Sequence, residues 1–236
     1  AYQLYGDGSA LTGISAGFSP DADENLVAGT NAGANFDGTS ACNNIFLGAC
    51  AGTCLESGCY NIFLGRNAGR RFCASTTKNN IAIGNNAMCA CNACTYEKGT
   101  GCHNIAMGCQ AMQQISSGKY NLAFGYCAGK LVGAGNYNIY FGHLAGANMC
   151  CHNNIAIGEC AMYGSNTGSG SCGCYNIAIG SHSGRCTTTA KYNVTIGREA
   201  GKKLTTGGEN IIMGSSAGRE IETSEGNIIS TSRHSS

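Results

Sequence analysis

Cysteines are the residues of this 236-residue chain that are best able to do chemistry, and there are seventeen of them. The densest cluster is Cys89-Ala-Cys91-Asn-Ala-Cys94, followed by Cys102 and His103. Thiolate and imidazole groups can bind zinc or an iron–sulfur cluster, but the run lacks the paired Cys-x-x-Cys knuckles that are typical of such sites. We therefore predict no metal site and no cofactor, and we expect disulfides or buried thiols instead.

The cysteine content favours an oxidising compartment. Cys42 and Cys59 hold the same place in two successive copies of the repeat described below. Equivalent positions in stacked coils lie about 4.8 Å apart, which a disulfide tolerates, so these two form the best candidate pair. An odd total leaves at least one thiol without a partner in the chain, and that thiol could link subunits. The disulfide candidates are Cys42, Cys59, Cys89, Cys91, Cys94, Cys102, Cys150, Cys151, Cys172 and Cys174.

Acidic and histidine side chains give little support for catalysis. Asp occurs only at positions 7, 21, 23 and 37, Glu is scattered over different repeat positions, and the histidines share no common offset from the repeat. Parallel β-helices do include polysaccharide lyases and hydrolases. Because no acid pair or triad can be assembled here, we predict no catalytic residues and no enzyme activity.

Three cations fall at one repeat position in consecutive copies, namely Arg185, Lys202 and Arg219. Stacking would place them about 4.8 Å apart, which is unfavourable unless anions lie nearby. Glu199 and Glu220 are candidate anions, and the row is then an ordinary solvated face of paired charges. The functional alternative is a stripe that binds sulfated or acidic cell-surface polysaccharide.

A second row is aromatic and directly precedes the lead Asn of the repeat. Tyrosine rows can stack against sugar rings, but in a repeat they more often brace a corner. The row consists of Tyr60, Tyr120, Tyr137, Tyr175 and Tyr192.

All these residues belong to a chain that repeats one short word twelve times. The word is Asn, an aliphatic residue, two mostly apolar residues, Gly, two variable residues, Ala, then Gly or Met, as in Asn44-Ile-Phe-Leu-Gly48. The lead Asn stands at positions 25, 44, 61, 80, 104, 121, 138, 154, 176, 193, 210 and 227, so the commonest step is 17 residues. The apolar core of the word is too short for a helix stripe and ends at Gly, which predicts one short strand per copy.

One such strand cannot bury its own apolar face, so the copies must stack as parallel neighbours. The sequence therefore predicts an all-β parallel β-solenoid, a β-helix or β-roll of about twelve coils over residues 25–236. Residues 1–24 are expected to form an N-terminal cap or a subunit-contact arm. We expect the lead Asn residues to form a hydrogen-bonded ladder, the Gly to adopt positive φ or to lack room for a Cβ, and the Ala to occupy a tight inner corner.

Within each strand, we expect the residues one and three after Asn, such as Ile81 and Ile83, to fill the interior. The residue two after Asn should then face outward. That row carries no charge, so something must cover it. We expect another copy of the chain, around a threefold axis or along a filament, with a loop of the same chain as the alternative. The predicted subunit-contact residues are Phe46, Phe63, Tyr140, Ile212 and Ile229.

The spelling of the word resembles known repeats. Asn80-Ile-Ala-Ile-Gly84 and Asn176-Ile-Ala-Ile-Gly180 resemble the repeats of trimeric autotransporter adhesin heads, and the longer form with spacers such as Thr205-Thr-Gly207 is similar to repeats of bacteriophage tail fibres and bacterial surface adhesins. The resemblance implies a β-roll or β-solenoid fold and a fibrous or adhesive role. Adhesin heads keep a shorter and stricter period, and neither family is normally so rich in cysteine.

Composition sets limits on partners and location. A net charge of +1 with 11% charged residues offers no general attraction to nucleic acid. No stretch is long and apolar enough to span a bilayer, and the start at Ala1 suggests a processed product. We expect an extracellular or cell-surface location, with a virion as the alternative.

Three functions agree with these observations. The first is a non-enzymatic structural subunit of an extracellular fibre with an adhesive surface, assembled from copies of itself and stabilised by disulfides. The second is the shaft or receptor-binding part of a viral tail fibre. The third is an ice-binding rod, which would need a flat array of Thr, whereas the Thr residues cluster in loops such as 187–189.

Overall fold

The structure is a computed structural model, and it describes residues 20–36, 40–73, 77–90, 99–164 and 171–231. These residues form an all-β parallel solenoid of about eleven turns with a period of about 17 residues, which confirms the predicted fold class. Residues 1–19, most of the predicted N-terminal arm, lie outside the described residues. The strands are β1 (Leu26–Ala28), β2 (Ile45–Leu47), β3 (Ile62–Leu64), β4 (Ile81–Ile83), β5 (Ile105–Met107), β6 (Leu122–Phe124), β7 (Ile139–Phe141), β8 (Ile155–Ile157), β9 (Ile177–Ile179), β10 (Val194–Ile196), β11 (Ile211–Met213) and β12 (Ile228–Ser230).

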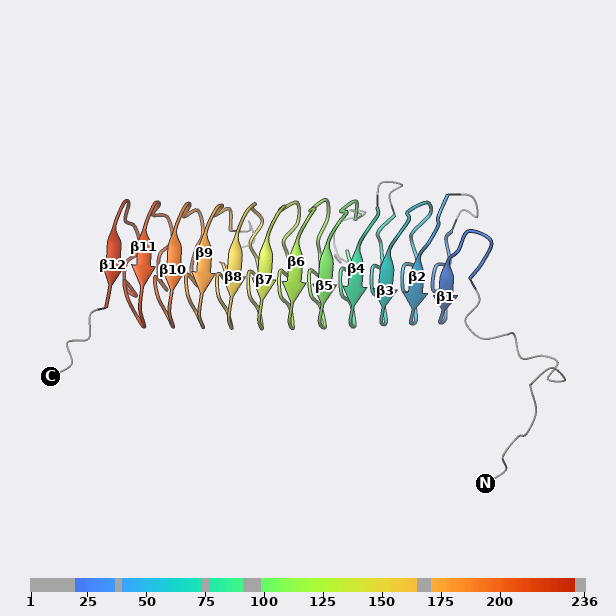
Figure 1. The fold of residues 1–236 in the computed structure, drawn as a ribbon, viewed down its shortest axis with the longest axis horizontal. Coiled ribbons are helices and arrows are strands. Elements are labelled where there is room, and N and C mark those ends of the chain that lie inside the picture. The colour runs from blue at the N-terminus through green and yellow to red at the C-terminus, as the bar shows by residue number, and fades with distance from the viewer. Residues whose placement is uncertain (1–19, 37–39, 74–76, 91–98, 165–170, 232–236) are drawn as a thin grey trace, which may run out of the picture.

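All twelve strands belong to one sheet and pair in chain order (Figure 1), so β1 and β12 lie at opposite ends of a rod. The pairing is parallel, and it aligns each position of the word with the same position in the next copy. Phe46, for example, lies beside Phe63. This register holds where the step between words lengthens, because Ile81 still pairs with Ile105. The longer step therefore leaves the register of the sheet unchanged.

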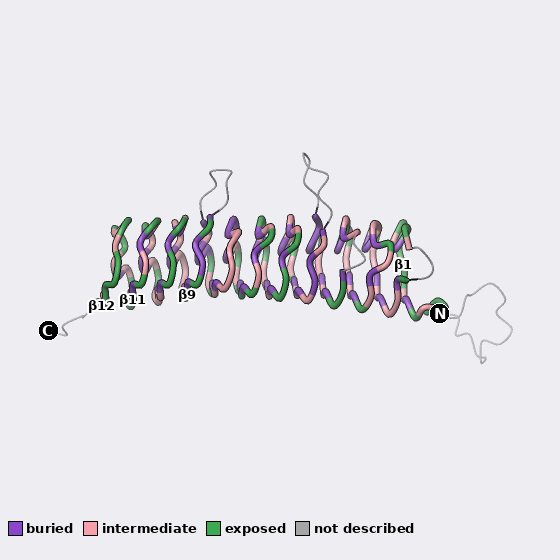
Figure 2. The backbone as a smooth tube through the Cα atoms, turned by 90° about the horizontal axis from the view of Figure 1, so that it is seen from above, coloured by how far each residue is buried: buried purple, intermediate pink, exposed green. Residues whose placement is uncertain are grey.

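From β2 to β11 the middle residue of each strand is buried in the interior, so our prediction of which face is inside was wrong. In the first coil the middle residue, Val27, is 37% exposed. Phe46, Phe63, Tyr140 and Ile212 are fully buried and belong to the core, not to a subunit contact. Ile229, in the last coil, is half-buried and packs against the same interior. The outer residues of the strands instead form the surface, and buried segments recur in every coil along the rod (Figure 2).

The reason for this inversion is that the interior is thin. It receives one strand side chain per coil, and in five coils that side chain is only Ala. The bulkier aliphatic pairs of the word have no room there and lie on the opposite face. The five buried Ala residues are Ala82, Ala106, Ala123, Ala156 and Ala178.

Two positions of the word share one volume of the core. Where the middle strand residue is an aromatic ring, the residue that follows the word's Ala is Gly, and a Cβ on Gly52 would lie 2.3 Å from the ring of Phe46. Where the middle residue shrinks to Ala82, the partner position holds the fully buried Met88. The pairs Ala106 with Met112 and Ala156 with Met162 repeat this exchange. In the coils of Ala123 and Ala178 the last position is Gly all the same, and Gly129 and Gly184 lie against Tyr140 and Thr195 of the next coil. Close packing with the same or the next coil therefore accounts for the Gly or Met at the end of the word.

The lead Asn residues form the predicted ladder, and every one from Asn25 to Asn210 is buried. The Asn121 Nδ2 group donates to Asn104 Oδ1 at 3.0 Å and to the Gly135 carbonyl at 2.7 Å. The Asn121 Oδ1 atom accepts from the Asn138 backbone N–H at 3.0 Å and from Asn138 Nδ2 at 2.9 Å. These bonds satisfy buried polar groups and hold neighbouring coils in register.

The Gly that closes each strand has both of the expected properties. Gly108 adopts a φ of +136°, and a Cβ there would lie 2.4 Å from the Gly125 carbonyl oxygen of the next coil. The coils approach each other too closely at this corner for any side chain. The Ala of the word is also buried as predicted, for example at Ala51 and Ala68.

Candidate functional site

The outer face of the sheet is apolar along the whole rod. Its two rows are the first and third residues of the strands, and from β2 to β11 every one is aliphatic, Met or Phe. Phe141 is 49% exposed, and its ring stacks on Phe124 with centroids 4.9 Å apart. Twelve strands of three residues give a face of about 53 by 10 Å, roughly 500 Å². An uncharged face of this size is a candidate interaction surface, and it replaces the subunit-contact residues that the sequence suggested.

The aromatic row is present, but its rings stack on one another. The stacked pairs are His103–Tyr120, Tyr120–Tyr137 and Tyr175–Tyr192, with centroids 4.8 to 5.1 Å apart and planes within 13°. Because ring faces inside the row already have partners, only edges, hydroxyl groups and the end rings remain open to a sugar. The row therefore braces the corner of the coil.

The cation row is partly neutralised by carboxylates. Lys202 Nζ lies 2.9 Å from Glu199 Oε1, and Arg219 Nε lies 3.3 Å from Glu199 Oε2. The hydrogen bond from Lys202 holds the pKa of the Glu199 carboxyl below its ordinary value. The third cation, Arg185, lies over the Tyr163 ring, 5.8 Å from its centroid. Two of the three predicted polysaccharide-binding cations are thus brought together around one carboxylate, as in a solvated face of paired charges.

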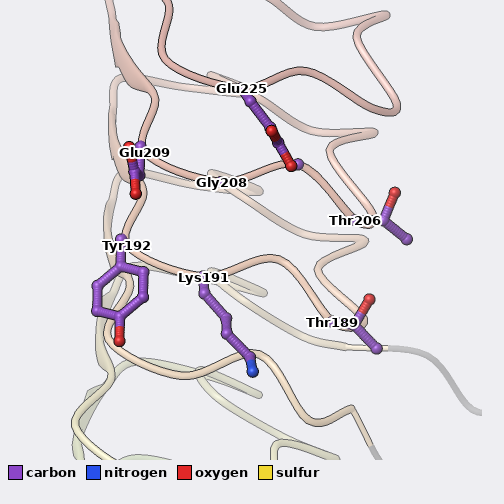
Figure 3. Close-up of a pocket in the computed structure, with 8 residues that line it drawn as sticks. Thr189, Lys191, Tyr192, Thr206, Gly208, Glu209 and Glu225 are labelled. Carbon is purple, nitrogen blue, oxygen red and sulfur yellow. The ribbon is translucent and has the colours of Figure 1, made fainter.

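A polar hollow of about 380 Å³ lies on the return side of the coils that precede β10, β11 and β12. Figure 3 shows Lys191 and Tyr192 from one coil, Glu209 from the next and Glu225 from the one after, with side chains that extend away from the backbone. Thr189 and Thr206 complete its polar lining. These groups can hydrogen-bond a polar molecule such as a sugar. Sequence reasoning missed this hollow, although Lys191, Gly208 and Glu225 share one place in three successive words of equal length.

The donor atoms of His143, Glu159 and Cys160 lie within 4.8 Å of one another. Their nitrogen, oxygen and sulfur atoms are a chemically suitable set for zinc, and no other such group occurs among the described residues. Burial, however, raises the pKa of the Cys160 thiol and opposes the thiolate that a metal needs. Sequence reasoning missed this cluster, although its members share the fifth and sixth places after the lead Asn, and that shared offset was the available signal.

Two disulfides with both cysteines among the described residues join neighbouring coils. One links Cys42 and Cys59, whose Cα atoms are 4.7 Å apart, and the other links Cys151 and Cys174, at 5.3 Å. Each bond fastens one turn of the solenoid to the next, so it resists separation of the coils.

The other candidate cysteines differ in state. Cys89 is disulfide-bonded, Cys91 and Cys94 lie outside the described residues, Cys172 is exposed, and Cys102 and Cys150 carry thiols. Cys102 lacks a disulfide because Lys78 and Lys119 hold its place in the adjacent coils.

The two ends of the rod differ chemically. At the first coil, the Asp21 N–H donates to the Asn25 carbonyl at 2.9 Å, and the Asp21 carboxylate accepts from Asn25 N at 2.8 Å and Nδ2 at 3.1 Å. Leu26 and Asn25 make the same bonds to Asn44 one coil later. Asp21 thus occupies the place of a preceding coil, as an N-terminal cap would.

At the last coil, no such cap is found in the part of the chain that the structure describes. Asn227 donates to Asn210 Oδ1 from its backbone N–H at 3.1 Å and from Nδ2 at 3.2 Å, but no described donor reaches its own Oδ1. The Ile228 side chain is 81% exposed. β12 is an edge strand with β11 as its only neighbour in the sheet.

Comparison of the chain with protein-family models, curated proteins and solved structures found no match. The described residues contain no helix with the length and apolar character needed to cross a membrane.

Proposed function

We propose that the chain is a non-enzymatic structural subunit of an extracellular fibre, in which copies stack end to end through the edge strands of the solenoid. The observation that carries the proposal is the open edge of β12, at which a twelve-stranded sheet and its Asn ladder stop without a described cap. An uncapped solenoid is a template for a further strand.

The backbone N–H and C=O groups on the outer edge of β12 determine which hydrogen bonds a further strand can form there. The Asn227 carbonyl accepts from Ile211 N–H at 2.8 Å, and the Thr231 N–H donates to the Met213 carbonyl at 3.3 Å, so these groups face β11. Backbone groups alternate in direction along a parallel strand, which turns the N–H and C=O groups of Ile228 and Ser230 away from the sheet. A stacked copy can pair these four groups at about 0.5–1.5 kcal/mol each.

The apolar outer face supports a second contact, between rods lying side by side. Two faces of about 500 Å² would bury roughly 1,000 Å², less than the 1,200–2,000 Å² of a typical stable interface. Two single copies that lie side by side therefore bind each other only weakly. In a fibre of stacked copies the buried area grows with fibre length, so side-by-side association follows end-to-end assembly in this proposal.

The disulfides between coils favour an oxidising, extracellular setting for the fibre. Binding of acidic polysaccharide by Arg185, Lys202 and Arg219 stays a prediction, and the Glu199 pairing reduces the positive charge that it relies on. Retention of the protein on immobilised heparin at low salt, lost in the triple Ala variant, would support it.

Electron microscopy of the purified, oxidised protein tests the proposal. We expect filaments with a 4.8 Å axial spacing and a subunit repeat of about 58 Å or slightly more, from twelve or more coils. The variant Ser230→Pro removes the hydroxyl and the backbone N–H, which faces away from β11, so it should keep the wild-type circular dichroism but shorten the filaments. Ser230→Ala is the matched control, because it loses the same hydroxyl and keeps the N–H.

Filaments of unchanged length from Ser230→Pro would contradict stacking through β12. Isolated short trimers of the wild-type protein would favour the tail-fibre alternative. Monomers that inhibit ice recrystallisation would favour the ice-binding alternative.

A further inference from the structure

Residues 9–17, outside the described residues, spell an imperfect thirteenth copy of the word. Ser9 takes the place of Asn, Gly13 stands four residues later, and Ala16 and Gly17 stand seven and eight residues later. The step from Ser9 to Asn25 is 16 residues, the same as the step from Asn138 to Asn154. The segment therefore matches one copy of the word in both spacing and step length.

The packing rules of the described coils agree with this interpretation. The middle strand position points inward, and in residues 9–17 that position holds the apolar Leu11. A large inward residue is paired in the observed coils with Gly in the last position of the word, as Phe46 is with Gly52. The segment follows this rule, with Gly17 in that position.

Within one copy, the place in front of Asn25, the lead residue of the first coil, is already taken. Asp21 supplies the N–H and the carboxylate oxygens that Asn25 would otherwise receive from a preceding coil. The outer edge of β12 has the opposite character, because Asn227 Oδ1 has no described donor. Each lead Asn brings two donors to the preceding ladder oxygen, its backbone N–H and its Nδ2 group. Ser9 can bring the same number, from its N–H and its hydroxyl.

We propose that residues 9–17 of one copy add to the outer edge of β12 of a second copy, as a thirteenth coil that joins the two rods. This rests on the proposed end-to-end stacking and names the segment that makes the junction. Leu11 then covers Ile229, which is only half-buried at the free end. Gly17 and Asp21 are four Cα steps apart, at most about 14 Å, so the second rod begins directly beyond the junction.

Three forms of the protein test the junction: the wild type, a variant that lacks residues 1–17, and the point variant Leu11→Asp. Deletion leaves Asp21 and all described coils intact. Leu11→Asp places a carboxylate at an inward position and should shorten the filaments by about tenfold or more. Leu4→Asp is the matched control, because it makes the same change in the same segment outside the word.

A labelled peptide of residues 1–20 gives a readout that does not depend on filaments. Fluorescence polarisation should show that it binds the deletion variant, and that Leu11→Asp in the peptide or Ser230→Pro in the protein abolishes binding. The filament repeat should correspond to thirteen coils, about 62 Å, against about 58 Å for direct stacking of twelve.

The outcomes separate this inference from the proposed function. Wild-type-length filaments from the deletion variant would overturn the junction coil and leave end-to-end stacking in place. Peptide binding that Ser230→Pro leaves unchanged would also overturn it. Absence of filaments from the wild-type protein would contradict the proposed function itself.

Discussion

Replacing Asn121 with Ala in the middle of the ladder should be among the most damaging single changes in the chain. The side chain takes part in four hydrogen bonds of 2.7 to 3.0 Å, and it is buried. Its loss leaves the Gly135 carbonyl and the Asn138 donors unpaired in the interior. At about 0.5–1.5 kcal/mol for each bond, we expect the free energy of unfolding to fall by about 2–6 kcal/mol.

Asn227→Ala is the matched control at the end of the ladder. Its Nδ2 group donates to Asn210 Oδ1 and to the Glu225 carbonyl, and the residue is exposed. Water can replace those bonds, so the expected loss is below about 1 kcal/mol. The two variants differ in position along one ladder and not in chemistry.

Guanidinium unfolding followed by circular dichroism measures both variants, with the disulfides in the same state throughout. A solenoid can unfold in segments, so amide hydrogen exchange in the coils beside residue 121 should accompany the optical measurement. Equal losses for Asn121→Ala and Asn227→Ala, or a loss below about 1 kcal/mol for Asn121→Ala, would refute the claim that the buried amides hold the coils together.

Three further predictions concern single positions. Gly108→Ala should destabilise the protein by at least about 3 kcal/mol, whereas Gly133→Ala, where a Cβ meets open space, should cost about 1 kcal/mol; thermal unfolding distinguishes them. Tyr140→Phe should raise stability by about 1–3 kcal/mol in denaturant titration, because its buried hydroxyl has no hydrogen-bond partner among the described residues; a loss of stability would indicate a hidden partner. The pKa of Glu199 is lowered, chiefly by its hydrogen bond from Lys202, so its stabilising effect is complete above the ordinary pKa of 4.5 and is lost as the pH falls through the lowered value. Wild type and Glu199→Gln should therefore differ in melting temperature at pH 7 and converge at low pH.

The sequence predicted the fold because periodicity constrains a solenoid directly. One word with a step near 17 residues allows only stacked coils, and the Asn and Gly positions have physical roles that do not depend on which face is inside. Which face of each strand points inward was harder to predict from the sequence. A three-residue strand with apolar residues at every position carries no alternation, so neither face could be recognised from polarity.

The side-chain volumes at two positions of the word did carry a signal that identifies the inward face of the strand. Large middle residues occur with Gly in the last position of the word, as in Phe63 with Gly69, and three of the five Ala residues occur with Met, as in Ala82 with Met88. Ala123 and Ala178 depart from this pattern, because Gly129 and Gly184 follow them. The outer positions show no such exchange. Only residues that share a packed interior need to compensate each other in volume.

The hollow at residues 189–225 and the His143 cluster were missed although their spacing was readable. Lys191, Gly208 and Glu225 share the fifteenth place after the lead Asn in words of equal length, and His143 and Glu159 share the fifth. The sequence does not show which of these places line an open hollow, because that depends on the path of the return segments. The cation row was noticed because its three members carry the same charge.

Every amide of the Asn ladder points the same way, with its oxygen toward the following coil. A filament built by continuing that ladder has a direction, much as a cytoskeletal polymer has a plus and a minus end. Its two tips are chemically unlike, one closed by Asp21 and one exposing the Asn227 acceptor. Growth by addition of subunits is then polar, and two fibres that lie face to face can be distinguished as parallel or opposed.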